Sequence, residues 1–344
     1  MIDFRYHLVS IVAVFLALAV GIVLGSTELR GAAFTALEGT SNALSHKLDA
    51  ANSQNSALQQ EVSGDQAFAQ AAEPVLLAHL LDGKRAVVIT APGAPSAVVN
   101  GITTALGDSG ATVSGQVTLS AKFADTSASN LSLLDQLTQR VAPSDLTLAN
   151  GTPQQQAAQV LASALVSSGS SGSSGSGGSS GSGGHTVGSQ AAQTILSSYS
   201  AGQFITVSGQ PAQGATLAVI VTAATPPSGG TSDPANQAIV SLAQEFGSSS
   251  QATVVAGSYA GSGQGSAISA VRASGAANNA STVDNADEVN GQIVVVQALS
   301  QQLNGHKPGS YGTQSDATSA GPSPAPAPSG SPSAGTRTTS KGKK

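Results

Sequence analysis

The 344-residue chain contains no cysteine and one methionine, at position 1. Without cysteine it can form neither disulfide bonds nor thiolate metal sites, so cysteine usage does not indicate a compartment. The histidines do not pair with one another at helical or strand spacing; they are His7, His46, His79, His185 and His306. Because soft metal ions need convergent Cys, Met or His ligands, we expect no such site within one chain and assign no metal ligands.

Aromatic and charged residues are also scarce, at 3% and 9% of the chain. Four of the 13 basic residues lie in the last eight positions, which leaves nine basic against 18 acidic side chains before them. An acidic body with so few aromatics argues against a nucleic-acid partner. Seven Phe, four Tyr and no Trp are too few for the aromatic girdles of a transmembrane β-barrel.

Patterns typical of enzymes are missing as well. No Gly-x-Ser-x-Gly elbow occurs with a usable histidine. Residues 261–266 resemble a dinucleotide-binding loop, but Ser266 replaces the third glycine, and no acid follows about twenty residues on in a clear strand. We therefore expect no catalytic residues and no bound cofactor.

One stretch is apolar without interruption: the seventeen residues from Leu8 to Leu24 carry no charge. As a helix they would rise about 26 Å, close to the thickness of the hydrocarbon core of a bilayer. We predict a transmembrane signal-anchor over residues 1–30, with lipid as partner and Arg5, Tyr6 and Phe15 as anchoring residues. The alternative is a secretory signal peptide cleaved after Gly25. As the first segment of the chain, an anchor favours an internal amino terminus and an external remainder.

Residues 31–73 show a heptad repeat typical of a coiled coil. One core position holds Phe34, Ser41, Leu48, Asn55, Val62 and Ala69, and the other holds Leu37, Leu44, Ala51, Leu58 and Asp65. A polar residue such as Asn55 at a core position fixes register and favours a dimer. We expect a homo-oligomer through this helix; the alternative is an amphipathic helix packed on its own domain.

From residue 80 to residue 305, short β-branched runs alternate with helical segments. This rhythm predicts a three-layer α/β domain with a mostly parallel sheet. The expected strands are 84–90, 111–119, 204–207, 217–221 and 252–255, and the expected helices are 96–106, 128–140, 153–166, 187–199, 234–246, 265–273 and 286–303. Ser96 and Thr152 are expected N-caps, and Asp233-Pro234 is an expected helix start.

Two segments are of low complexity. Residues 167–184 are only Ser and Gly, and residues 313–344 are dominated by Pro, Ala, Ser, Gly and Thr before a basic tip. Neither can bury apolar surface, so we predict a disordered insertion and a disordered tail. Because the α/β rhythm is the same on both sides of the insertion, we favour one domain over two small ones.

A polar cluster near the last helix is the best candidate for a functional site. Asp284, Asn285 and Asp287 lie close together in sequence, beside Glu288, and we group Tyr311 with them. The alternative is a structural role, in which these acids cap a helix and complement its dipole.

Both ends of the chain resemble the actinobacterial copper transporter family MctB. The resemblance rests on Arg5-Tyr6-His7-Leu8-Val9-Ser10, on residues 13–19 and 21–26, on Ser281-Thr-Val-Asp-Asn285 with Gly291 and the apolar helix to Leu303, and on Tyr311-Gly312. It covers roughly residues 1–312. The Ser/Gly insertion and the Ala/Pro tail look peculiar to this chain.

The resemblance implies a cell-envelope protein of an actinobacterium, tied to copper efflux and resistance, with copper as the transported ion. That family is described as an outer-membrane channel, and either inner or outer membrane is compatible with this sequence. By the resemblance, Arg5 is the inner-face anchor, while Asp284 and Asn285 open the last helix. The alternative function is a structural or scaffold protein of the envelope whose link to copper is indirect.

Overall fold

The computed structural model describes residues 4–167, 187–212 and 214–323. Nearly all of the predicted Ser/Gly insertion, and the predicted tail from residue 324 onwards, lie outside these ranges. The chain forms two compact units, Met1–Ala67 and Phe68–Lys344.

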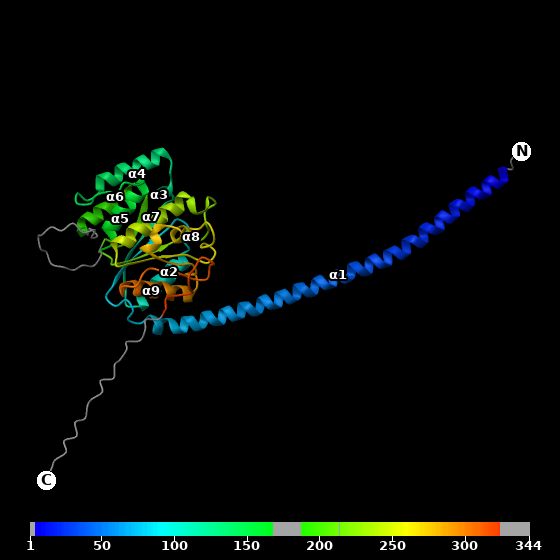
Figure 1. The fold of residues 1–344 in the computed structure, drawn as a ribbon, viewed down its shortest axis with the longest axis horizontal. Coiled ribbons are helices and arrows are strands. Elements are labelled where there is room, and N and C mark those ends of the chain that lie inside the picture. The colour runs from blue at the N-terminus through cyan, green and yellow to red at the C-terminus, as the bar shows by residue number, and fades with distance from the viewer. Residues whose placement is uncertain (1–3, 168–186, 213, 324–344) are drawn as a thin grey trace, which may run out of the picture. The chain divides into compact units, whose positions relative to one another are not determined.

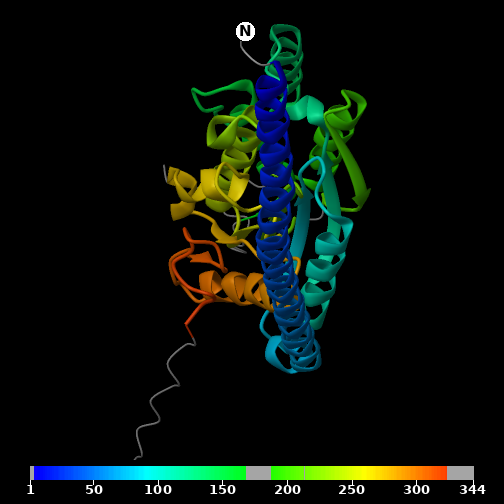
Figure 2. The ribbon, with the colours of Figure 1, turned by 90° about the vertical axis from the view of Figure 1, so that its right-hand side faces the viewer.

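Helix α1 (Phe4–Leu77) is one continuous helix, drawn in blue in Figures 1 and 2. The predicted apolar span and the predicted coiled-coil segment are therefore consecutive parts of a single helix. Within the first unit, every side chain whose burial is described is exposed, including the heptad leucines Leu37, Leu44 and Leu58.

In the described part of the chain, the second unit is built on a seven-stranded sheet with the order β3-β2-β1-β4-β5-β6-β7. The strands are β1 (Arg85–Thr90), β2 (Thr112–Leu119), β3 (Ile205–Gly209), β4 (Leu217–Val221), β5 (Ala252–Ala256), β6 (Ser281–Val283) and β7 (Ser310–Tyr311). Neighbouring strands are parallel, except that β3 runs antiparallel to β2. The predicted mostly parallel α/β sheet is confirmed.

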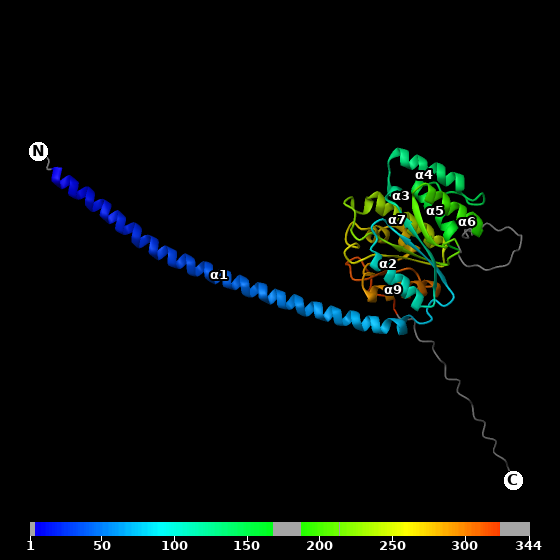
Figure 3. The ribbon, with the colours of Figure 1, turned by 180° about the vertical axis from the view of Figure 1, so that it is seen from behind.

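Helices cover both faces of this sheet. They are α2 (Ser96–Asp108), α3 (Ala121–Ala124), α4 (Ala128–Val141), α5 (Pro153–Leu165), α6 (Ser189–Ala201), α7 (Pro234–Ser249), α8 (Ala267–Arg272) and α9 (Val289–Leu303), with 3₁₀ turns at Gly230–Ser232 and Gly275–Asn278. Figures 1 and 3 show α2 beside α9 on one face, and α4, α5, α6 and α7 on the opposite face. The sheet is therefore the middle of three layers.

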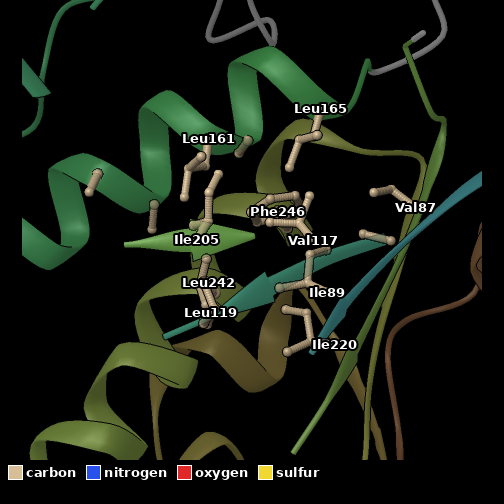
Figure 4. Close-up of a cluster of buried hydrophobic side chains, with 14 of the residues drawn as sticks. Val87, Ile89, Val117, Leu119, Leu161, Leu165, Ile205, Ile220, Leu242 and Phe246 are labelled. Atoms are coloured by element: carbon tan, nitrogen blue, oxygen red, sulfur yellow. The ribbon is translucent and has the colours of Figure 1, made fainter. Parts of the chain in front are cut away.

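Alternation along the strands fills two hydrophobic cores. In β1, Val87 and Ile89 face the α5 and α7 side, whereas Ala86 and Val88 face the α2 and α9 side. Figure 4 shows Leu161 and Leu165 of α5 and Leu242 and Phe246 of α7 gathered with strand residues of the first core. Both cores consist of residues between Leu77 and Tyr311, so the second unit has complete cores of its own.

Local capping explains several helix boundaries. The Oγ1 atom of Thr152 accepts a hydrogen bond from the Gln155 N–H at 3.2 Å, and Asp233 Oδ1 accepts one from the Ala235 N–H at 2.9 Å. These two predicted starts are confirmed. The prediction for Ser96 was wrong: Pro95 occupies the N-cap position and Ser96 is the first helical residue.

Candidate functional site

The apolar stretch of α1 is the first candidate functional feature. Among the described residues, one helix is long and apolar enough to cross a membrane, Tyr6–Gly25. Its side chains are exposed, including the predicted anchoring residues Tyr6 at 79% and Phe15 at 66%. Arg5 lies in the first turn of α1, but its side chain is outside what the structure describes. Exposed apolar side chains over 20 residues suit contact with lipid.

The predicted polar cluster is centred on Asp284, which directly follows β6 and is completely buried. Arg272, the last residue of α8, points its Nη2 atom at Asp284 Oδ2 over 2.9 Å. The arginine side chain is itself only 5% exposed. Burial of both charges requires that their remaining hydrogen-bonding groups also find partners.

Those partners come from residues 311–316, which comprise the last residue of β7 and the segment after it. Asp284 Oδ1 accepts from the Thr313 N–H at 2.7 Å, and Oδ2 accepts from the Gln314 N–H at 3.2 Å. Arg272 donates to the Tyr311 carbonyl at 2.7 Å and also contacts Asp316. We call Arg272, Asp284 and Asp316 the ion-pair clasp, because together they fasten β7 and the following residues to β6 and α8.

A glycine makes this close approach feasible. Gly312 has a φ of +129°, and a Cβ atom at that position would lie 2.0 Å from Asp284 Oδ1. Any other residue at position 312 would collide with the buried carboxylate in a backbone conformation that side chains disfavour. The segment 311–314 is thus shaped around Asp284.

The side chains of the other predicted residues make hydrogen bonds outside the clasp. Asp287 Oδ1 accepts from the Tyr259 N–H at 2.8 Å, and the hydroxyl of Tyr311 donates to Gln301. Burial raises the pKa of Tyr311 above its usual value. Asn285 is 4% exposed, and its Oδ1 atom has no hydrogen-bond partner among the described residues.

The structure corrects the expected role of Asp284 and Asn285 at the start of the last helix. Helix α9 begins at Val289, with Glu288 at the N-cap position but without a side-chain cap. The oxygens of Asp284 are instead engaged by Arg272 and the backbone of residues 313–314. A carboxylate that is fully buried and saturated with donors is suited to hold structure together, not to bind a ligand from solvent.

Sequence reasoning missed the ion pairs of this site, in which Arg272 contacts both Asp284 and Asp316. One signal was present: Arg272 is the only lysine or arginine between Arg140 and Lys307. A lone arginine in an apolar helical stretch needs an acidic partner, because a charge is costly to bury unpaired. Which of the acids supplies it depends on contacts 12 and 44 residues away, which sequence spacing does not reveal.

Comparison with known proteins decides the family. The family model described as "Copper transport outer membrane protein, MctB" matches residues 1–322. The chain belongs to the MctB family.

Curated relatives agree with this assignment. The protein named "Copper transporter MctB" from Mycobacterium tuberculosis (strain ATCC 25618 / H37Rv) is 27% identical over 326 residues, which cover 93% of this chain and 98% of the relative. The protein of the same name from Mycobacterium leprae (strain TN) is 27% identical over 328 residues, with the same coverage. The MctB match includes both the apolar helix and the ion-pair clasp.

Proposed function

We propose that this chain takes part in copper transport or efflux at the cell envelope. The supporting observation is the match to relatives named copper transporters over 93% of the chain. Copper would be the substrate of the process, not a resident cofactor, and the protein would catalyse no reaction. The apolar helix would hold the protein in a membrane, which suits a protein acting on ions that cross one.

Copper handling is tested in a deletion strain of the native host. The strain is complemented with the full chain, with Phe15→Leu or with Phe15→Arg, and cell-associated copper is measured after copper exposure. We expect copper to accumulate in the deletion strain and to return to normal with the full chain and with Phe15→Leu. Unchanged copper content and tolerance after deletion would contradict the proposal.

We further propose that the amino terminus lies inside and the α/β domain outside the cytoplasm. The apolar segment comes first in the chain, and Arg5 precedes it. Protease added to intact spheroplasts should then degrade the α/β domain and spare a short fragment containing residues 1–25. Amino-terminal sequencing of the membrane-bound protein distinguishes an anchor, which begins at Met1 or Ile2, from a cleaved signal peptide, which leaves a start near Ser26.

A scaffold role is the second candidate, and the scarcity of copper-coordinating side chains favours it. The chain has no Cys and one Met, the side chains that Cu(I) prefers. Among the described residues, no group of three His, Cys, Asp or Glu gathers to hold a metal. Purified full-length protein in liposomes that enclose a Cu(I)-sensitive dye separates the two roles: copper entry supports transport, whereas no entry together with co-purification of an envelope protein supports a scaffold.

We also propose that the protein is a homo-oligomer through residues 31–73. Leu44, Leu48 and Leu58 of the heptad are 67%, 59% and 52% exposed in the single chain. A stripe of exposed leucines at heptad spacing is stabilised when a second helix covers it. Anchoring in one membrane would align two such helices in parallel.

A further inference from the structure

The sheet reverses its strand order between β1 and β4. After β1 the chain enters α2 on one face, and after β4 it enters α7 on the other face. The two loops therefore diverge at the carboxyl edge of the sheet. In open α/β sheets, ligands bind in the crevice at such a switch point.

A cavity of about 310 Å³ occupies this position. Its walls come from the loop after β1, residues 119–124 after β2, the loop after β4, the first turns of α7, and Ala267 of α8. We call it the switch-point cavity. Its volume lies at the lower end of the range for small-molecule sites. Segments distant in sequence thus form one cavity at the carboxyl edge of the sheet, where the strand order favours ligand binding.

The walls of the switch-point cavity carry no charge. None of the described residues that line it is Lys, Arg, His, Asp or Glu. Lys122 lies between two lining residues, but its Nζ atom donates to the Gly202 carbonyl at 2.9 Å and lies 4.6 Å from the centre of the Phe204 ring. The cationic group is therefore already occupied away from the cavity.

The backbone around the cavity does not favour a phosphate either. Pro92 and Pro95 flank the turn into α2 and lack the N–H groups with which such turns hold phosphates. At the start of α7, the Asp233 carboxylate already caps the helix. That negative charge would repel an anion at the amino terminus of α7, whose first turns line the cavity.

One buried polar side chain on the wall has an unused hydrogen-bonding group. Asn236 is 2% exposed, and its Nδ2 atom donates to the carbonyls of Gly230 and Gly265, both at 2.7 Å. These bonds occupy both amide hydrogens and fix the orientation of the side chain. No donor among the described residues contacts the Oδ1 atom, so this residue of the cavity lining keeps an unused acceptor.

We propose that the switch-point cavity binds a small uncharged molecule with an apolar body and one hydroxyl or N–H group that donates to Asn236 Oδ1. The apolar walls, including the buried Phe123 ring, would contact the body of the ligand. The absence of wall charges selects against anions and cations, and the Asn236 Oδ1 acceptor orients the donor. This site is independent of the handling of copper.

The test uses the second unit, residues 68–344, whose cores are complete, and three related probes. The probes are 2-naphthol, 2-methoxynaphthalene, which lacks the donor, and 2-naphthyl phosphate, which adds charge. We expect saturable binding of 2-naphthol, affinity about 2- to 10-fold lower for the methoxy compound, and no binding of the phosphate at 1 mM. Isothermal titration and ligand-observed NMR measure the affinities.

Two substitutions locate the binding. Ala235 is exposed and lines the cavity, so Ala235→Leu would fill its mouth without disturbing the core. Ala128 is also exposed but lies outside the lining, so Ala128→Leu is the matched control. We expect at least a 10-fold loss with Ala235→Leu and none with the control. Equal binding by both variants, absence of saturable 2-naphthol binding, or equal affinity for the phosphate would overturn the proposal.

Discussion

One buried carboxylate, that of Asp284, fixes the position of the segment that follows β7. It is fully buried, and its oxygens meet the Arg272 guanidinium and the backbone of residues 313–314. The sequence indicated a polar cluster here because acids gather at 284–288, but it left open whether their role was functional or structural. The answer depends on partners from α8 and from beyond β7, which come together only in the folded sheet.

Removing the charge of Asp284 should strongly destabilise the domain. In Asp284→Asn the Arg272 guanidinium stays buried and loses its buried counter-charge, with the partly exposed Asp316 as its remaining ion-pair partner, so we expect a loss of about 3–5 kcal/mol. Asp316→Asn is the matched control, because Asp316 contacts the same arginine but is 40% exposed, and we expect a loss of about 0–1 kcal/mol. Chemical denaturation of residues 68–344 measures both; equal losses would contradict the clasp.

Glu73 makes stability depend on pH. It is 8% exposed, its Oε1 atom has no partner among the described residues, and burial, aided by the charge of Asp108, raises its pKa above the usual value of a glutamate. Because the folded state holds this proton more tightly, the contribution of Glu73 is fully favourable below the pKa of the unfolded state and is lost as the pH rises through the elevated pKa of the folded state.

Glu73→Gln should therefore unfold at a higher temperature than the unmodified protein at pH 7, with the difference shrinking towards pH 4. Thermal unfolding of the full chain in detergent over this pH range tests the prediction. Glu61→Gln, which makes the same change at an exposed position of the same helix, is the matched control. A constant difference across the range would contradict a titration of Glu73.

Individual helices and strands were predictable where their signals are local. Thr152 and Asp233 cap their helices as expected, because side-chain capping and Pro at the first turn act within four residues. Strands β6 and β7 were missed, since they are three and two residues long and are stabilised by their neighbours in the sheet. Periodicity cannot appear in so few residues.

Oligomerisation through the heptad segment of α1 can be tested with single substitutions in that helix. Leu58→Asp should raise the dissociation constant of the oligomer about tenfold or more, because association would bury carboxylates without partners. Gln60→Asp adds the same charge two residues away, at an outward heptad position, and should leave association unchanged. Analytical ultracentrifugation in a density-matched detergent distinguishes them; equal effects would argue for an unpaired amphipathic helix.

Membrane retention of the whole molecule should depend on one apolar helix. Phe15 lies near the middle of Tyr6–Gly25, where an arginine costs about 2.5–3.5 kcal/mol. Phe15→Arg should therefore shift the protein from the carbonate-resistant membrane fraction to the soluble fraction, while Phe15→Leu should not. Full retention of Phe15→Arg would mean that other parts of the chain also hold the membrane.

The fold class of the second unit was predictable from the sequence, but the order of the strands in its sheet was not. Alternating strands and helices indicated a parallel sheet, yet the order β3-β2-β1-β4-β5-β6-β7 depends on pairings such as Val88 with Val219, which lie far apart in sequence. The switch-point cavity is invisible in the sequence for the same reason. Its wall residues are mostly small and apolar, and they form a cavity only because the fold brings their separate segments together.

The ion-pair clasp can form only late in the synthesis of the chain. Arg272 reaches Asp316, 44 residues later, so the clasp can close only after residue 316 has left the ribosome. A nascent chain that stops before Tyr311 presents the edge of β6 and a buried arginine without its full set of partners. Such truncated products would be substrates for chaperones and proteases, which gives the cell a means of rejecting incomplete copies before they act.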